Sequence, residues 1–172
     1  MKQSDREKLI ELLGLYPLPH EGGLFRQTYL SEDLLPASGL PPRYREDKPA
    51  GTAIYYFLTS EPDSFSTLHR LPTDEIYHFY LGDPVELLLL DPAGSSRRVV
   101  LGQEVFSGQH VQYVVPRDVW QGSRLIPGGD FALLGTTMAP GYTQPDFELA
   151  EKDIMLARYS EFAELIEHLT VD

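Results

Sequence analysis

The chain has 172 residues, of which 42% are hydrophobic and 23% charged, as expected for one soluble globular domain with a hydrophobic core. Its formal net charge of −12 argues against nucleic acids and anionic membranes as partners, because both attract basic surfaces. The absence of cysteine excludes disulfides, cysteine-bound zinc and a thiol nucleophile, and without a secretory signal or a long apolar run we expect a cytoplasmic location.

The N-terminal pattern predicts a short amphipathic helix over residues 5–13. Ser4 can cap this helix and Glu7 completes a capping box, while Gly14 marks its end. The segment 24–30 has the composition of a strand. Residues 31–51 are rich in proline and glycine, so we expect a long loop or flap there.

The middle of the chain predicts short strands separated by turn-forming residues. Strands that recur every 8 to 12 residues, roughly, are typical of β-sandwiches and barrels. We therefore expect an all-β fold with minor flanking helices, one of them over residues 159–169. The expected strands are 52–59, 64–71, 75–81, 85–90, 97–101, 110–115, 119–126 and 131–138.

Two of these strands are apolar on both faces. The segment 85–90 holds a run of leucines, and the segment 75–81 alternates little between apolar and polar residues. A strand with one face in water alternates, so the second face of these strands must be covered. Helices of the same chain or a second copy could cover it, and we predict a homodimer.

A histidine and a glutamate flank the turn between two expected strands. His69 ends one strand and Glu75 begins the next. In an antiparallel pair these side chains can meet across the ladder on the interior face. They could ligate a divalent metal, or form an acid–base pair in which Glu75 orients His69. Strand alternation places His78 on the opposite side from Glu75.

Motifs spread along the chain match one group of proteins as a set. They lie at residues 18–23, 25–29, 69–82, 116–121, 139–142 and 146–149. By these motifs the chain resembles the cupin superfamily, and within it the cupin-5 branch, long labelled a domain of unknown function. The resemblance runs from about residue 9 to residue 169.

The resemblance implies a double-stranded β-helix, the jelly-roll sandwich of cupins, which is usually dimeric and has a ligand pocket inside the barrel. It also implies a single cupin domain over residues 1–172. Within it, 1–23 would form an N-terminal helix and turn, 24–145 the jelly-roll core, and 146–172 a C-terminal arm and helix. The family has no assigned general activity, so the resemblance informs the fold more than the function.

The metal-binding pattern of cupins is only partly kept. His69 matches the second histidine of the first motif and Glu75 its glutamate, one residue further apart than is commonest. Thr67 stands at the first histidine position and Gln121 at the third. His69, Glu75 and Gln121 would therefore hold a divalent metal only weakly, and we expect no cofactor.

Other polar and aromatic residues are candidates for the pocket wall. An arginine in a strand can hold an anionic ligand group, and a tryptophan can stack on a sugar or base. Alternation, however, places the tryptophan at 120 on the opposite face from residue 121. The candidate ligand-binding residues are Arg26, Thr67, Arg70, Trp120 and Gln121.

Three acidic residues have two interpretations each. Glu21, in the sequence His20-Glu21-Gly22-Gly23, could reach the pocket or lie in a tight turn, and we favour the turn. Asp146 and Glu148 could be acids of a lid or solvated charges, and we favour solvated charges.

Three functions follow, from different classes. We favour a small-molecule-binding protein that sequesters or senses a small polar metabolite, such as a sugar or a nucleotide, around His69, Glu75 and Gln121. The alternative is an enzyme similar to the metal-free sugar-nucleotide epimerases, in which His69 is the base, Glu75 orients it and Tyr77 reprotonates the substrate. A metal-dependent oxygenase or isomerase ranks third.

Overall fold

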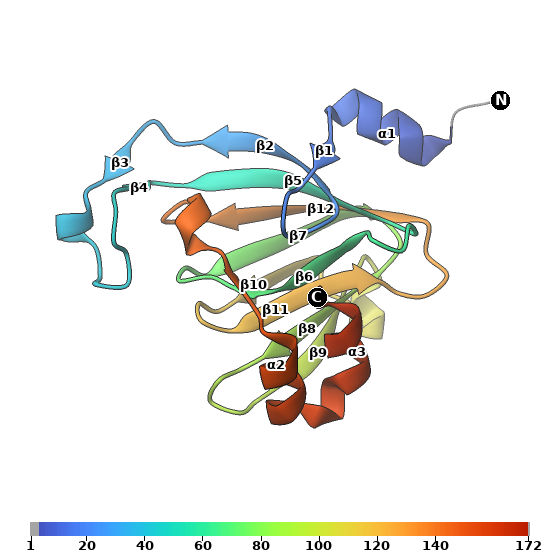
Figure 1. The fold of residues 1–172 in the computed structure, drawn as a ribbon. Helices are drawn as coiled ribbons and strands as arrows, with labels where there is room; N and C mark the ends of the chain where they lie inside the picture. Colours follow the sequence, from blue (N-terminus) through green and yellow to red (C-terminus); the bar gives the residue numbers. More distant parts are fainter. Residues whose placement is uncertain (1–3, 172) are drawn as a thin grey trace.

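The computed structural model describes residues 4–171, and its centre is a pair of β-sheets packed face to face (Figure 1). The six-stranded sheet has the order β1-β2-β5-β12-β7-β10, and the five-stranded sheet has the order β13-β6-β11-β8-β9. The strands are β1 Tyr16–Pro17, β2 Leu24–Leu30, β5 Thr52–Thr59, β6 Phe65–Arg70, β7 Glu75–Gly82, β8 Val85–Leu90, β9 Arg97–Leu101, β10 Gln112–Val115, β11 Trp120–Leu125, β12 Phe131–Met138 and β13 Glu148–Leu149.

The interior between the sheets is filled by alternate side chains of facing strands. Tyr56 and Leu58 of β5 meet Leu87 and Leu89 of β8 in one cluster of buried residues, together with Phe79 of β7. This alternation is the pattern from which the strands were predicted, and the predicted all-β class is confirmed.

One detail of the expected pairing is wrong. His69 and Glu75 were expected to meet across one antiparallel ladder, but β6 and β7 belong to different sheets. The chain crosses from one sheet to the other within residues 71–74, because β6 belongs to the five-stranded sheet and β7 to the six-stranded sheet. Both side chains are buried in the interior, His69 from one sheet and Glu75 from the other.

The N-terminal helix α1, Asp5–Leu13, has the predicted ends. Ser4 and Glu7 form the capping box, and Gly14 takes the left-handed conformation at φ 62°. The apolar face of α1 packs over Phe57 and Leu133, on one end of the outer face of the six-stranded sheet. The helix therefore shields only part of that face, as Figure 1 also shows.

The C-terminal region has more helix than expected. The single predicted helix over 159–169 is replaced by α2 Lys152–Arg158, the 3₁₀ turn η4 Ser160–Phe162 and α3 Ala163–His168. These helices cover the outer face of the five-stranded sheet (Figure 1). Met155 and Ile166 pack there on Leu88 and Leu90. The second face of β8 is thus covered by the chain's own helices. No helix within residues 4–171 is long and apolar enough to cross a membrane.

The proline-rich flap contains a small hairpin of its own. Strand β3, Leu34–Leu35, pairs with β4, Lys48–Pro49, around the 3₁₀ turn η1, Ala37–Gly39. Further 3₁₀ turns lie at η2, Val105–Ser107, and η3, Gln144–Asp146. The ammonium of Lys48 is buried and lies 2.6 Å from a carboxylate oxygen of Asp146 in η3. The expectation that Asp146 is solvated is therefore wrong.

Candidate ligand cavity

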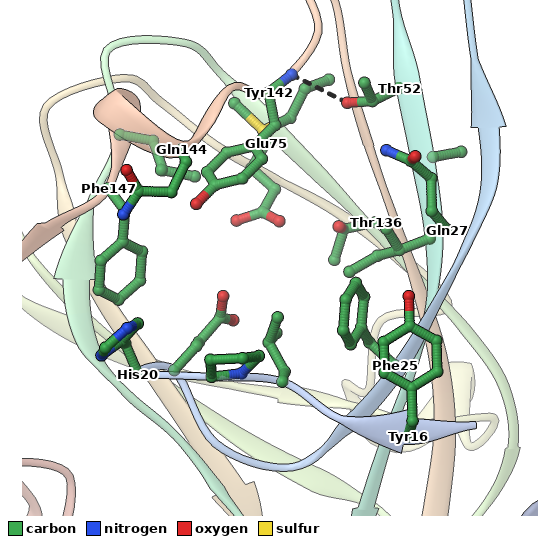
Figure 2. Close-up of a pocket in the computed structure, with 17 residues that line it drawn as sticks. Tyr16, His20, Phe25, Gln27, Thr52, Glu75, Thr136, Tyr142, Gln144 and Phe147 are labelled. Carbon is green, nitrogen blue, oxygen red and sulfur yellow. Dashed lines mark hydrogen bonds between the residues drawn. The ribbon is translucent and has the colours of Figure 1, made fainter.

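A cavity of about 640 Å³ opens at the end of the sandwich where the start of β5, the loop after β1 and the segment after β12 meet. Figure 2 shows side chains converging on it from several strands and loops. Its wall is mostly apolar and aromatic, with a few polar groups, which is the composition of small-molecule sites. The lining residues are Tyr16, Leu18, Pro19, His20, Glu21, Phe25, Gln27, Thr52, Ala53, Ile54, Leu71, Glu75, Thr136, Met138, Tyr142, Gln144 and Phe147.

Glu75 is the buried carboxyl that β7 contributes to this wall. Its side chain points inward because it alternates with Ile76, and only 7% of it is exposed. The amide nitrogen of Gln121 donates to its Oε2 at 2.8 Å. Burial, followed by the charge of Glu21, raises the pKa of Glu75 to about 7, against the opposing effect of His69.

Glu21 is the second carboxyl in the wall, and it comes from the loop between β1 and β2. The backbone N–H and the hydroxyl of Thr67 both donate to the Glu21 carbonyl, at 2.7 and 2.8 Å. The hydroxyl of Ser66 donates to its carboxylate at 3.1 Å. Burial raises the pKa of Glu21 to about 7. The loop is the tight turn that we favoured, yet it also brings Glu21 to the cavity.

The segment after β12 closes the cavity with aromatic side chains. The backbone N–H of Tyr142 donates to the hydroxyl of Thr52 at 2.9 Å, and its ring points into the cavity near Glu75 (Figure 2). Burial and the nearby Glu21 raise the pKa of Tyr142 to about 12, so its hydroxyl stays protonated. Phe147 lies across the cavity from Phe25.

His69 lies behind this wall rather than in it. The ring of Phe147 lines the cavity and stacks on the imidazole, with 4.8 Å between ring centroids. The Nδ1–H of His69 donates to the carbonyl of Thr67 at 2.7 Å, which leaves Nε2 as the acceptor. Burial lowers the pKa of His69, so the ring is neutral at neutral pH. A substrate in the cavity would meet Phe147 before His69.

The other predicted site residues near the interior support the wall from behind. Of the predicted set, only Glu75 lines the cavity. Gln121 holds the carboxylate of Glu75, while its own Oε1 is buried and has no hydrogen-bond partner among the described residues. Thr67 holds the Glu21 loop. Tyr77 is packed in the core between the sheets.

The structure directs Arg26, Arg70 and Trp120 away from the cavity. Arg26 donates to the Leu13 carbonyl at the end of α1, at 2.9 Å. Arg70 forms a two-pronged ion pair with Glu148 at 2.7 and 2.8 Å. Its guanidinium lies 4.5 Å above the ring of Trp120, which packs among the residues under α2 and α3. These three residues are bound by the protein itself, so their predicted ligand contacts have no support in this geometry.

The predicted weak metal site fits a transition metal poorly. Within residues 4–171 no three His, Cys, Asp or Glu side chains are grouped so that they could hold an ion. Gln121 turns its amide nitrogen, which cannot ligate, toward Glu75, so only His69 and Glu75 of the predicted set could offer ligand atoms. We therefore derive no chemistry through a metal at His69, Glu75 and Gln121.

Sequence reasoning missed most of the cavity wall. We considered Glu21 but favoured a turn, and we did not identify Tyr16, Phe25, Tyr142 and Phe147 as parts of one wall. The signal that could have found them was the set of motifs at 18–23, 25–29 and 139–149, which lie outside the two histidine-bearing cupin motifs. These segments are distant in sequence, and only the fold brings them to one end of the sandwich.

Three related proteins resemble the whole chain or most of it. It is 29% identical over 136 residues to the uncharacterized protein YML079W of Saccharomyces cerevisiae, and the match covers 74% of this chain and 65% of that protein. The chain therefore spans just under two thirds of that relative. A hypothetical protein from Leishmania major is 28% identical with a TM-score of 0.84, over 98% of this chain and 100% of that one. Protein SO0799 from Shewanella oneidensis is 28% identical with a TM-score of 0.82, over 99% of each.

A more distant structure shares the fold alone. Oxalate decarboxylase of Bacillus subtilis matches with a TM-score of 0.51 and 13% identity, over 90% of this chain and 37% of that one. A model of the family Cupin_5, described as cupin superfamily (DUF985), matches residues 7–150. With the jelly-roll architecture and the motifs in agreement, the chain belongs to the Cupin_5 family of the cupin superfamily.

Proposed function

We propose that this protein binds a small organic molecule in the cavity, with Glu75 as its central polar contact. The observation that carries the proposal is the placement of Glu75. It is a buried carboxyl that lines a cavity of about 640 Å³ and is held in position by the buried amide of Gln121. A carboxyl group that is desolvated beside an open volume is better satisfied when a ligand supplies hydrogen-bond donors.

The composition of the wall argues against a sugar nucleotide as the ligand. Among the residues of 4–171 that line the cavity, none is lysine or arginine, whereas Glu21 and Glu75 are both present. A diphosphate would meet carboxylates without a compensating cation, at a cost in free energy. The shared fold does not assign an activity, because cupin-like folds host many functions.

A thermal-shift screen tests the proposal. Neutral, anionic and cationic metabolites are added to the wild type, to Gln27→Trp and to Gln112→Trp. Gln27 lines the cavity, so its replacement by tryptophan should obstruct the cavity, whereas Gln112 is also an exposed glutamine but lies outside the cavity wall, on β10 beside His78. A ligand at about a hundred times its Kd should raise Tm by roughly 5 to 10 °C in the wild type.

We expect at least one compound to stabilise the wild type and Gln112→Trp but not Gln27→Trp. If every stabilising compound acts equally on all three proteins, the cavity is not the binding site and the proposal is wrong.

Proton transfer is a second candidate function, favoured by the raised pKa of Glu75. A general acid or base works best when its pKa is near the working pH, and burial brings Glu75 there. Compounds that bind in the screen are incubated in heavy water with the wild type and with Glu75→Gln. If a compound takes up deuterium at a carbon position with the wild type but not with Glu75→Gln, the protein is an enzyme. If no compound takes up deuterium, the protein only binds its ligand.

A further inference from the structure

The two carboxyls of the cavity have neutral partners only. Glu21 accepts from the hydroxyl of Ser66, and Glu75 accepts from the amide of Gln121. Neither carboxyl takes part in an ion pair with a lysine, arginine or histidine of residues 4–171. By contrast, the buried carboxylate of Asp146 lies 2.6 Å from the ammonium of Lys48. A buried carboxylate without a cation is costly, and the missing charge can come from a ligand.

The rest of the wall is suited to the body of an organic cation. Tyr16 and Phe25 pack edge to face with ring centroids 4.6 Å apart, and both line the cavity. Phe147 lies on the opposite side (Figure 2). Aromatic faces carry negative electrostatic potential, so they attract a cation as well as an apolar group. The volume of about 640 Å³ is within the range of sites for drug-sized ligands.

We propose that the cavity binds an organic monocation, an amine whose ammonium group lies between Glu21 and Glu75 and whose apolar or aromatic body packs against Tyr16, Phe25 and Phe147. This inference rests on the proposed function and adds the chemical class of the ligand. The charge of Glu21 contributes to the raised pKa of Glu75, so without a ligand the two carboxyls tend to keep a proton. An ammonium group bound between them can take the place of that proton.

Three probes of one shape test the charge of the ligand. 2-Phenylethylamine, 2-phenylethanol and phenylacetate share the ring and differ in the head group, which is cationic, neutral or anionic. Isothermal titration calorimetry at pH 8 should give a Kd for the amine at least about tenfold lower than for the alcohol, because a hydrogen bond to a charged group is the stronger one. Phenylacetate should bind more weakly than the alcohol.

Neutral variants of the pair provide the second arm. In Glu21→Gln and in Glu75→Gln the Kd of the amine should rise to within about threefold of the Kd of the alcohol. Retained binding of the alcohol shows that the cavity is intact in the same sample. Glu104→Gln is the control, since it removes the same charge from an exposed position outside the cavity wall and should keep the wild-type preference.

Lowering the pH provides the third arm. At pH 5.5 both carboxyls bind protons and the amine should lose its advantage over the alcohol. Burial lowers the pKa of His69, which disfavours a positive charge on its ring, and the tyrosines near the pair have raised pKa values, so they stay neutral in this range. His20 also lines the cavity, so His20→Gln is assayed in parallel to measure what His20 contributes to the pH dependence of the preference for the amine. The titratable groups that face the pair are His20, Tyr56, His69, Tyr77 and Tyr142.

Each outcome distinguishes the two proposals. If the alcohol or phenylacetate binds as tightly as the amine, the inferred charge is wrong while the cavity remains a binding site. If neither neutral variant changes the preference, the carboxyl pair does not recognise the ligand. A cationic ligand is also excluded if no probe binds and the screen finds only neutral or anionic ligands whose binding is abolished in Gln27→Trp.

Discussion

Gly22 is the residue that allows the Glu21 loop to lie against β6. Its φ of 95° is in the left-handed region, and a Cβ there would overlap the carbonyl oxygen of Phe65. Gly94 has a similar φ of 103°, but a Cβ there would have no neighbour within 4 Å. Replacing either glycine by alanine costs the free energy of a positive φ, but only at Gly22 would the added Cβ also overlap another atom. The two substitutions can therefore be compared to isolate the cost of that overlap.

We expect Gly94→Ala to lower the free energy of unfolding by about 1 kcal/mol and Gly22→Ala to lower it by at least about 3 kcal/mol. Urea denaturation of the wild type and both variants measures the difference. Equal effects would mean that the loop can move away from Phe65 at little cost, and that the position of Glu21 is not fixed by Gly22.

The carboxyl pair should make the stability of the empty protein depend on pH. Burial raises the pKa of Glu75 above its unfolded value, so the folded state binds the proton more tightly. The stabilisation from this proton is fully present below about pH 4.5 and is lost as the pH rises through about 7. Between pH 5 and 8 the Tm of the wild type should therefore fall relative to that of Glu75→Gln.

Differential scanning calorimetry of both proteins across this range measures the effect, and the comparison removes contributions that both share. The histidines with lowered pKa, His69 among them, act in the opposite direction but are present in both proteins. A constant difference in Tm between pH 5 and 8 would show that Glu75 is ionised at all these pH values.

At the scale of elements, a buried ion pair ties the flap to the segment that closes the cavity. Lys48 of β4 contacts Asp146 of η3, Glu46 and the hydroxyl of Thr143. The hydroxyl of Thr143 in turn donates to Glu46 at 2.6 Å. These contacts join segments nearly a hundred residues apart in sequence, so the flap and the cavity-closing segment should order together.

Lys48→Met should cost about 3 to 5 kcal/mol of unfolding free energy, because it leaves Asp146 buried without its cation. The double variant Lys48→Met/Asp146→Asn should recover most of this loss. Lys8→Met, which removes the exposed pair with Asp5, should cost less than about 1 kcal/mol. Guanidinium denaturation measures all three, and a double variant no more stable than Lys48→Met would contradict the expected coupling.

The sequence predicts the strands well because burial on alternate sides leaves a local signature. The bounds of β5, β8, β9 and β12 agree with the expected ranges, and α1 has the expected cap. The cavity was predicted poorly because its wall depends on which segments meet at the end of the sandwich. The two-sheet crossing between His69 and Glu75, and the burial of Asp146 by Lys48, are properties of tertiary packing that no local pattern contains.

At the scale of the whole molecule, the six-stranded sheet offers the surface on which a second copy could pack. The leucines of β8 are covered by α2 and α3, but among the described residues the clusters formed by the helices do not include Ile76, Tyr80 or Val114 on the outer face of β7 and β10. Tyr80 is 43% exposed and Val114 is 48% exposed on that face, beside the half-buried Ile76 and His78. A contiguous sheet face without charged side chains is typical of a subunit interface.

We expect a homodimer through this face, with a mass of twice 19.4 kDa. Tyr80→Glu/Val114→Glu should dissociate it, because each carboxylate would have to be buried without a partner. Ile154→Glu is the control, since Ile154 is 52% exposed on α2, beside the other sheet. Sedimentation velocity at micromolar concentration distinguishes the dimer from the monomer, and a wild-type species near 19.4 kDa would show that the chain is a monomer.

The way in which the Glu21 loop is anchored has a consequence for how this site could evolve. Thr67 holds the loop through the backbone carbonyl of residue 21, so the anchor does not depend on which side chain residue 21 carries. A single base change converts a glutamate codon into a lysine codon. Because Glu75 would remain, a lysine at position 21 would leave one positive and one negative charge in the wall, so the same barrel would give up a preference for cations in one mutational step while the interior that maintains the fold stays untouched.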